Sequence, residues 1–263
     1  MEIFPLLLST VLLRPYVFIF LGLHLLAGGL QLGLKRITVF TLLAYLIAFT
    51  SEYSSTRNGI PYGPYIYTGE THGKELYISN VPFMDSLSYA FLAYFSYSLA
   101  LLLVSPVKRN RWKAKLIDPP WHSKGALFLS AFLMTLQDVV VDPVALRGSG
   151  WFLGQIFYYP DRGTYFGVPL SNFVGWFVVG LAIIYCFQKL DRAMGWAGPC
   201  AENALLGPAC YFINMSFTLF LTFYIGEYLL GLLSLAIFAS IFYRTLQKVR
   251  NLNGRTHRSA PTP

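Results

Sequence analysis

Four carboxyl groups stand where long apolar segments begin or end. Glu52 closes the run "ITVFTLLAYLIAF", Asp85 follows a Val-Pro pair that opens another apolar run, and Asp138 and Asp142 close a third. Asp138 and Asp142 are four residues apart, so they share one face of a helix. Acids inside membrane segments are expensive and usually face a bundle interior or a cavity. We therefore predict that these four carboxyl groups are catalytic and perform acid–base chemistry.

Aromatic and amide side chains accompany the carboxyl groups. The loop after Glu52 reads "GIPYGPYIYTG", with tyrosines spaced by Gly and Pro, and further rings begin the next apolar runs. The residues predicted to bind substrate are Tyr62, Tyr65, Tyr67, Tyr89, Asn172 and Trp176. Burial disfavours the charged form of a carboxyl group, and aromatic rings attract cations. This combination suits proton donation to an alkene, while the alternative for the rings is an aromatic belt at the membrane surface.

Apolar segments of membrane-spanning length carry these residues. Charged residues make up 12% of the chain and apolar residues 55%, whereas a soluble domain has about 25% charged residues. A span needs about 20 apolar residues. The predicted spans are 15–33, 37–53, 84–105, 124–145, 170–189, 203–223 and 225–244. The predicted fold class is all-α, a polytopic membrane helix bundle in which residues 1–245 form one domain. Because the last two segments are nearly continuous, the alternative is six spans with one broken helix.

The positions of the basic residues predict the orientation of the bundle. The net charge is +8, yet most of the 20 basic residues fall on one side of the predicted bundle. They are Lys35, Arg36, Lys108, Arg109, Arg111, Lys113, Lys115, Lys124, Lys189, Arg192 and the basic residues from Arg244 to Arg258. Cytoplasmic loops are enriched in Lys and Arg. We therefore predict a multi-pass protein of the cell membrane with its N-terminus outside and its C-terminus in the cytoplasm, and no nucleic-acid partner. Residues 246–263 are predicted to be a disordered basic cytoplasmic tail.

Two loops enter the following helix in the same way. Residues 81–89 read "VPFMDSLSY" and residues 168–176 read "VPLSNFVGW", with Asp85 matching Asn172 and Tyr89 matching Trp176. Each follows an aromatic, Gly-containing loop and, before that, a helix that ends in an acid. We interpret the pattern as a parallel internal repeat of helix–loop–helix units; the alternative is a chance match. Because helix direction alternates, all four carboxyl groups should lie near the outer end of the bundle. A simpler role for Asp85 and Asn172 is to cap a helix start.

Residues suited to metal or redox chemistry form no recognisable pattern. The three cysteines make no CxxC pair and the four histidines make no His box. A zinc or iron site would need such a spacing of ligands. The sequence therefore predicts neither a zinc site nor a di-iron site.

Five stretches together resemble one family. Glu52, "GIPYGPYIYTG", "YISNVPF", "QDVVVDPVA" and "YFGVPLSNFVGW", in this order and spacing, are similar to the CruF-type carotenoid 1′,2′-hydratases, integral membrane proteins of carotenoid biosynthesis. The resemblance covers about residues 43–176, and the last two helices match only as apolar spans. The family adds water across the terminal 1,2 double bond of an acyclic end group, giving a tertiary alcohol. Its members act on lycopene-like or γ-carotene-like C40 chains, or on C50 precursors of bacterioruberin.

The resemblance implies a cofactor-independent hydratase with an acyclic carotenoid as substrate. It also allows other carotenoid-pathway enzymes as partners in the lipid bilayer. Glu52 is then the first candidate for the acid, with Asp138 or Asp142 as its partner. Three alternative functions stay open. They are a membrane prenyltransferase that holds Mg²⁺ with the Asp138–Asp142 pair, a carotenoid cyclase and a proton-coupled transporter. The low acid content argues against a halophilic source, and so against the C50 precursors.

The predicted orientation can be tested by labelling single cysteines in intact cells. Cysteines introduced near Arg57, Lys74, Arg147 or Arg162 should react with a membrane-impermeant reagent added from outside. Cysteines in the 108–115 loop should react only after the cells are opened, since the positive-inside rule places this loop in the cytoplasm. Labelling of the 108–115 loop from outside would contradict the predicted depth of the four carboxyl groups.

Overall fold

A computed structural model describes residues 3–110, 113–196 and 203–256 of the chain. Seven of its helices are long and apolar enough to cross a membrane. They are α2 (Pro15–Leu32), α3 (Leu34–Asn58), α4 (Phe83–Val104), α5 (Lys124–Ala145), α6 (Leu170–Ala193), α7 (Leu206–Tyr224) and α8 (Tyr228–Thr256). A shorter apolar helix, α1 (Ile3–Leu13), precedes them. The prediction of an all-α polytopic bundle with seven spans is confirmed.

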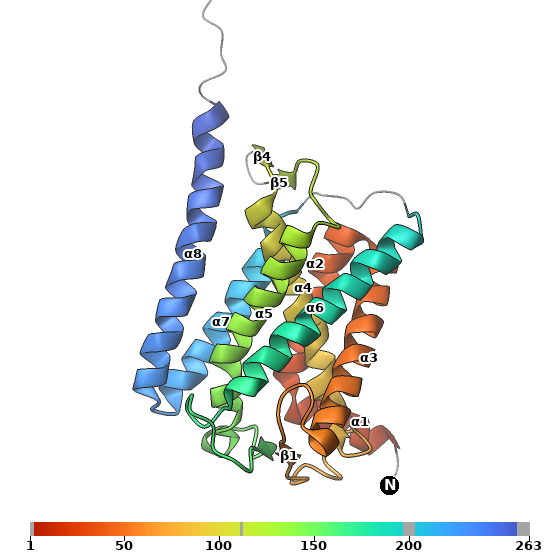
Figure 1. Ribbon diagram of the computed structural model, residues 1–263, viewed down its shortest axis with the longest axis vertical. Helices are drawn as coiled ribbons and strands as arrows, with labels where there is room; N and C mark the ends of the chain where they lie inside the picture. The colour runs from red at the N-terminus through yellow and green to blue at the C-terminus, as the bar shows by residue number, and fades with distance from the viewer. Residues whose placement is uncertain (1–2, 111–112, 197–202, 257–263) are drawn as a thin grey trace, which may run out of the picture.

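The structure rules out the alternative of six spans with one broken helix, and Gly226 is the reason. This glycine adopts a φ of 81°, a left-handed conformation that an L side chain rarely takes. It ends α7, and α8 turns back to pack beside α7 as a separate helix (Figure 1).

Two predicted helix ends are too early. α3 continues past Tyr53 to Asn58, where Gly59 (φ 72°) caps it and donates its backbone N–H to Ser55 O. Glu52 therefore lies inside the last turns of α3 and not at its end. α8 continues past Arg244 to Thr256, because residues such as Leu246, Gln247 and Lys248 are good helix formers. The boundary predicted at residue 245 thus falls inside α8, and the last part of the predicted tail, 257–263, lies outside the described residues.

α4 is the central helix of the bundle. It contacts α2, α3, α5, α6 and α7, and its candidate span is the most buried of the seven. α3 also packs against α6, and α5 packs against α6 and α7. α8 packs mainly on α7 at the edge of the bundle (Figure 1).

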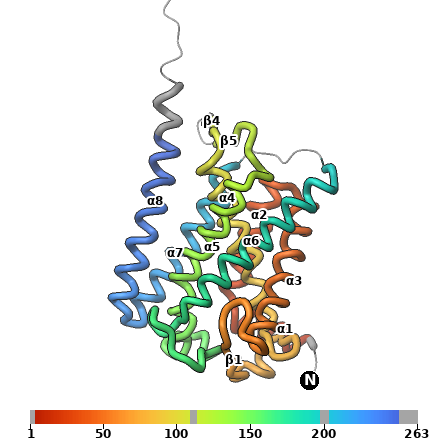
Figure 2. Tube along the Cα trace, viewed as in Figure 1, coloured from red at the N-terminus to blue at the C-terminus, as the bar shows by residue number. Residues whose placement is uncertain are grey.

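Short strands form in the loops, and the sequence did not predict them. Three two-stranded sheets form among the described residues. They pair β1 (Ile66–Tyr67) with β6 (Phe157–Tyr158), β2 (Tyr77–Ile78) with β3 (Val81–Pro82), and β4 (Val107–Asn110) with β5 (Lys113–Leu116). Figure 2 shows α1 and the loops around β1 at one end of the bundle and the β4–β5 hairpin at the other. A one-turn 3-10 helix, η1 (Gly148–Gly150), follows α5.

The two predicted repeat units meet at equivalent positions. The first unit is α3, its loop and α4, and the second is α5, its loop and α6. β1 of the first loop pairs antiparallel with β6 of the second, with Ile66 opposite Tyr158. Tyr89 of α4 stacks on Trp176 of α6, with ring centroids 4.3 Å apart and an interplanar angle of 9°. These contacts support the interpretation as a repeat, and they place both loops over one end of the same four helices.

Candidate active site

One cavity gathers all the residues that the sequence predicted for a site. It has a volume of about 160 Å³ and lies at the end of the bundle that the two long loops cover. Its wall includes Glu52, Asp85, Asp138, Asp142, Tyr62, Tyr65, Tyr67, Tyr89, Asn172 and Trp176. These residues come from four helices and one loop, and up to 124 positions separate them along the chain. The catalytic or binding role of each remains a prediction.

Asp138 and Asp142 of α5 form one side of the cavity together with an amide from α6. Asn172 Nδ2 donates to Asp138 Oδ2 at 2.8 Å and to Asp142 Oδ2 at 3.2 Å. Tyr159 Oη donates to Asp142 Oδ2 at 2.8 Å. Asp138 Oδ1 is buried and has no hydrogen-bond partner among the described residues. Asp138 therefore retains one oxygen that can accept a proton or a hydrogen bond from a molecule in the cavity.

The capping role considered for Asn172 is wrong. Pro169 occupies the N-cap position of α6, and no side chain bonds to the free N–H groups there. The Asn172 amide is buried and bridges the two carboxyl groups instead. A buried carboxyl group without a donor would cost more free energy than an uncapped helix start.

Glu52 lies on the α3–α4 side of the cavity and is 4% exposed. Tyr67 Oη is 3.2 Å from Glu52 Oε1, and the Ser86 hydroxyl of α4 bonds to Glu52 Oε2. Burial, and then the neighbouring Glu52 carboxyl, raise the pKa of Tyr67 well above its usual value of 10. The Tyr67 hydroxyl therefore stays protonated and donates to Glu52.

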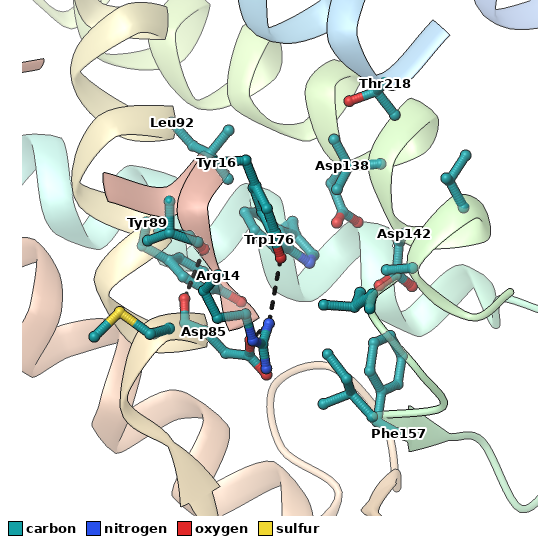
Figure 3. A pocket seen from close by; sticks show the side chains of 18 of the residues that line it. Arg14, Tyr16, Asp85, Tyr89, Leu92, Asp138, Asp142, Phe157, Trp176 and Thr218 are labelled. Carbon is teal, nitrogen blue, oxygen red and sulfur yellow. Dashed lines mark hydrogen bonds and ion pairs between the residues drawn. The ribbon is translucent and has the colours of Figure 1, made fainter. Parts of the chain in front are cut away.

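Arg14 is the charged residue of this site that the sequence analysis missed. It is 1% exposed and joins two carboxyl groups, with Nη2 2.8 Å from Glu75 Oε1 and Nη1 2.9 Å from Asp85 Oδ1. Nη1 also lies 3.3 Å from Tyr16 Oη. Figure 3 shows Arg14 between Asp85 and Tyr16, with Asp138 and Asp142 across the cavity. A lone arginine between the apolar runs of α1 and α2 was the signal for this role.

Aromatic rings complete the wall. Tyr62 is 1% exposed and lies 6.2 Å from Trp176 and 6.3 Å from Tyr89 between ring centroids. Tyr65 contacts Tyr67 and Tyr159 at 5.3 and 6.1 Å. Burial also raises the pKa of Tyr159, so this ring is neutral like the others. Neutral rings packed around one small space can stabilise a positive charge that forms inside it.

α7 supplies a part of the wall for which the sequence gave no signal. Asn214, Phe217, Thr218 and Leu221 line the cavity, although this helix was predicted only as an apolar span. Asn214 Nδ2 donates to Gln137 Oε1 at 3.0 Å. Asn214 and Gln137 are 77 positions apart in the chain, and only their contact shows that they belong together.

Comparison with known proteins identifies the family. Residues 4–241 match the family of carotenoid biosynthesis proteins, so the chain belongs to this family. It is similar to the bisanhydrobacterioruberin hydratase of Haloarcula japonica, with 28% identity over 185 residues. The aligned region covers 68% of this chain and 56% of the length of that relative. No solved structure matches the chain. The family match confirms the resemblance predicted from the five stretches.

The buried Arg14 ion pairs should contribute strongly to stability. The variant Arg14→Gln leaves the buried Glu75 and the partly buried Asp85 without their cation, and breaking a buried pair such as Arg14–Glu75 costs about 3–5 kcal/mol. We expect the midpoint of thermal unfolding of the detergent-solubilised protein to fall steeply. The control is Arg162→Gln at the same end of the bundle, because Arg162 is exposed and surface substitutions usually change stability by about 0.5 kcal/mol or less. Equal effects of the two variants would contradict the proposed importance of the ion pairs.

Proposed function

We propose that the protein hydrates the terminal 1,2 double bond of an acyclic carotenoid end group to give a tertiary alcohol. The observation that carries this proposal is a small, aromatic-lined cavity with carboxyl groups on opposite sides. Family membership and the similarity to a carotenoid hydratase support the same chemistry.

The size of the cavity fits the end of a hydrocarbon chain. An engineered apolar cavity of about 150 Å³ takes up one benzene molecule, and the cavity here measures about 160 Å³. It therefore accommodates about six carbon atoms. The terminal isopropylidene group of an acyclic carotenoid, with its two methyl groups and the adjoining carbons, is of this size.

The proposed reaction begins with protonation of the alkene. A carboxylic acid gives its proton to C2, the π electrons of the C1=C2 bond form the new C–H bond, and C1 becomes a tertiary cation. The rings of Tyr62, Tyr89 and Trp176 face this cation. A water oxygen then bonds to C1 while a carboxylate takes a proton from that water. Return of this proton to the first carboxyl group completes the addition of one water.

The surroundings of the carboxyl groups suggest how they divide the two roles. We assign the acid to Glu52, which Tyr67 and Ser86 hold in place. We assign the base to Asp138, because its Oδ1 is buried without a partner among the described residues. Asp142 accepts from Tyr159 and Asn172 and would orient the amide that holds Asp138. Asp85, which was also predicted to be catalytic, is bound to Arg14 and is the least suited of the four to exchange a proton.

The bridging amide weighs against the prenyltransferase alternative. A DxxxD pair that holds Mg²⁺ turns its carboxylate oxygens toward the cation. Here the Asn172 N–H group lies between Asp138 and Asp142 and bonds to both. An N–H donor at this point repels a cation, so the pair is better suited to proton transfer.

The product is the direct test of the proposed function. Expression in a bacterium that makes lycopene should convert part of the pigment into a species heavier by one water, with a tertiary hydroxyl at the chain end. Labelled water should supply the added oxygen, because the proposed reaction uses water as its only co-substrate. Incorporation of oxygen from O₂, or addition of a C5 unit, would overturn the assignment.

The carboxyl variants should separate catalysis from folding. Glu52→Gln keeps the size of the side chain and its hydrogen bonding but cannot protonate an alkene, and general acid catalysis contributes about 10²–10⁴-fold in rate. We expect Glu52→Gln and Asp138→Asn to lose hydration by this order at normal protein levels, and Asp142→Asn to lose less. Pigment masses and membrane protein levels are measured in the same cultures. A folded Glu52→Gln protein that hydrates at the parental rate would remove Glu52 from the mechanism.

A further inference from the structure

The cavity cannot hold a whole carotenoid, and this raises the question of where the rest of the chain lies. A pocket that encloses a drug-sized molecule has a volume of about 300–1,000 Å³, and a C40 chain is longer still. The cavity of about 160 Å³ takes only the end group. If the protein has the proposed function, the polyene of its substrate must therefore leave the cavity through one part of the wall.

Most of the wall is closed by tight packing. Between α6 and the loop after α3, a Cβ atom added at Gly175 would lie 2.6 Å from Tyr62 Cδ1 and 2.8 Å from Pro61 O. On the α5–α6 side, the Asn172 amide bonds to both Asp138 and Asp142. On the α5–α7 side, Val144 and Leu221 form a buried cluster with Leu230 of α8. A chain that left the cavity on these sides would have to break these contacts.

On the α2–α7 side, the cavity is lined by a cluster of ring side chains. Tyr16 of α2 stacks on Phe217 of α7, with centroids 5.7 Å apart and an interplanar angle of 24°. Trp151 of the loop after η1 lies 6.1 Å from Tyr16. All three line the cavity and are partly exposed. These partly exposed rings therefore stand between the cavity and the outside of the bundle.

A further ring continues this cluster to the surface of the bundle. Phe152 contacts both Tyr16 and Trp151 edge-on, at 5.9 and 4.8 Å between centroids, and it is 53% exposed. The neighbouring helix faces are apolar and open to lipid, since Ile19 of α2 is 61% exposed and Ile213 of α7 is 49% exposed. A continuous set of aromatic rings thus joins the cavity to the surface that faces the hydrocarbon of the membrane.

We propose that the seam between α2 and α7, formed by Tyr16, Trp151, Phe152 and Phe217, binds the conjugated polyene next to the reacting end group. The flat rings offer π faces to a flat polyene. Tyr16 is tied to the site by its bond with Arg14, which also holds Asp85, and Figure 3 shows its hydroxyl pointing down to Arg14 inside the cavity. The carotenoid would enter sideways from the lipid with its end group first.

Photo-crosslinking at matched surface positions tests this seam. A benzophenone-bearing phenylalanine analogue replaces either Phe152 or Phe132 in cells that make lycopene. Phe132 of α5 is 52% exposed, so it is as exposed as Phe152 but lies outside the seam. After irradiation, we expect the carotenoid-sized mass adduct on the protein to be several-fold more abundant at position 152. Equal yields at the two positions would overturn the proposal.

Narrowing the seam gives a second readout that does not depend on the analogue. Phe217→Trp enlarges the ring that closes the seam and should lower hydration several-fold at unchanged protein level, whereas Phe132→Trp should leave hydration unchanged. Parental hydration by Phe217→Trp would overturn the proposal. Hydration by the parental protein is measured in the same cultures, and its absence would refute the proposed function rather than the position of the seam.

Discussion

Carboxyl groups can be buried at the end of a membrane bundle only if the protein supplies their hydrogen-bond donors. The hydrocarbon offers none, and an isolated buried charge is far too costly. Arg14 donates to Glu75 and Asp85. Asn172 and Tyr159 donate to the Asp138–Asp142 pair. Tyr67 and Ser86 donate to Glu52. Each donor comes from a helix or loop different from that of its acceptor. Satisfying the carboxyl groups therefore fixes how the helices and loops are arranged at this end.

Two helix–loop–helix units, α3–α4 and α5–α6, provide this arrangement. Each unit carries its acids near the end of one helix and its aromatic residues in the following loop and helix. The pairing of β1 with β6 and the stacking of Tyr89 on Trp176 bring the two units face to face. One unit contributes Glu52 and the other contributes Asp138, so a cavity between the units has a carboxyl group on each side. An enzyme that uses one carboxyl group as acid and another as base needs the two groups to have different surroundings.

The same packing limits what the cavity can take. The close contact of Gly175 with Pro61 and Tyr62 and the bonds of Asn172 to Asp138 and Asp142 leave no room for a long molecule there, whereas a cluster of rings lines the α2–α7 seam. A hydrophobic substrate dissolved in the bilayer has no need of an aqueous entrance. A narrow cavity would suit the proposed reaction at the tip of a long chain, because water and the proposed carbocation would meet in a confined space.

The amino-acid sequence by itself determined the seven spans and the end of the bundle at which the acids lie. Runs of apolar residues and the alternation of helix direction are local properties that consecutive residues encode. They suffice to bring Glu52, Asp138 and Asn172 to the same depth. The five stretches that resemble carotenoid hydratases also pointed to the family that the comparison confirmed.

Only the tertiary structure decided which carboxyl group meets which donor. Arg14 and Asp85 are 71 positions apart in the chain, and Asn214 and Gln137 are 77 apart, so no local pattern could pair them. The rotation of each helix about its axis decides these contacts, and that rotation is fixed by the packing of all its neighbours. For this reason the sequence left a helix-cap role for Asn172 open beside its predicted role in the site, and predicted α7 only as an apolar span, whereas packing brings residues of both α6 and α7 to the cavity wall.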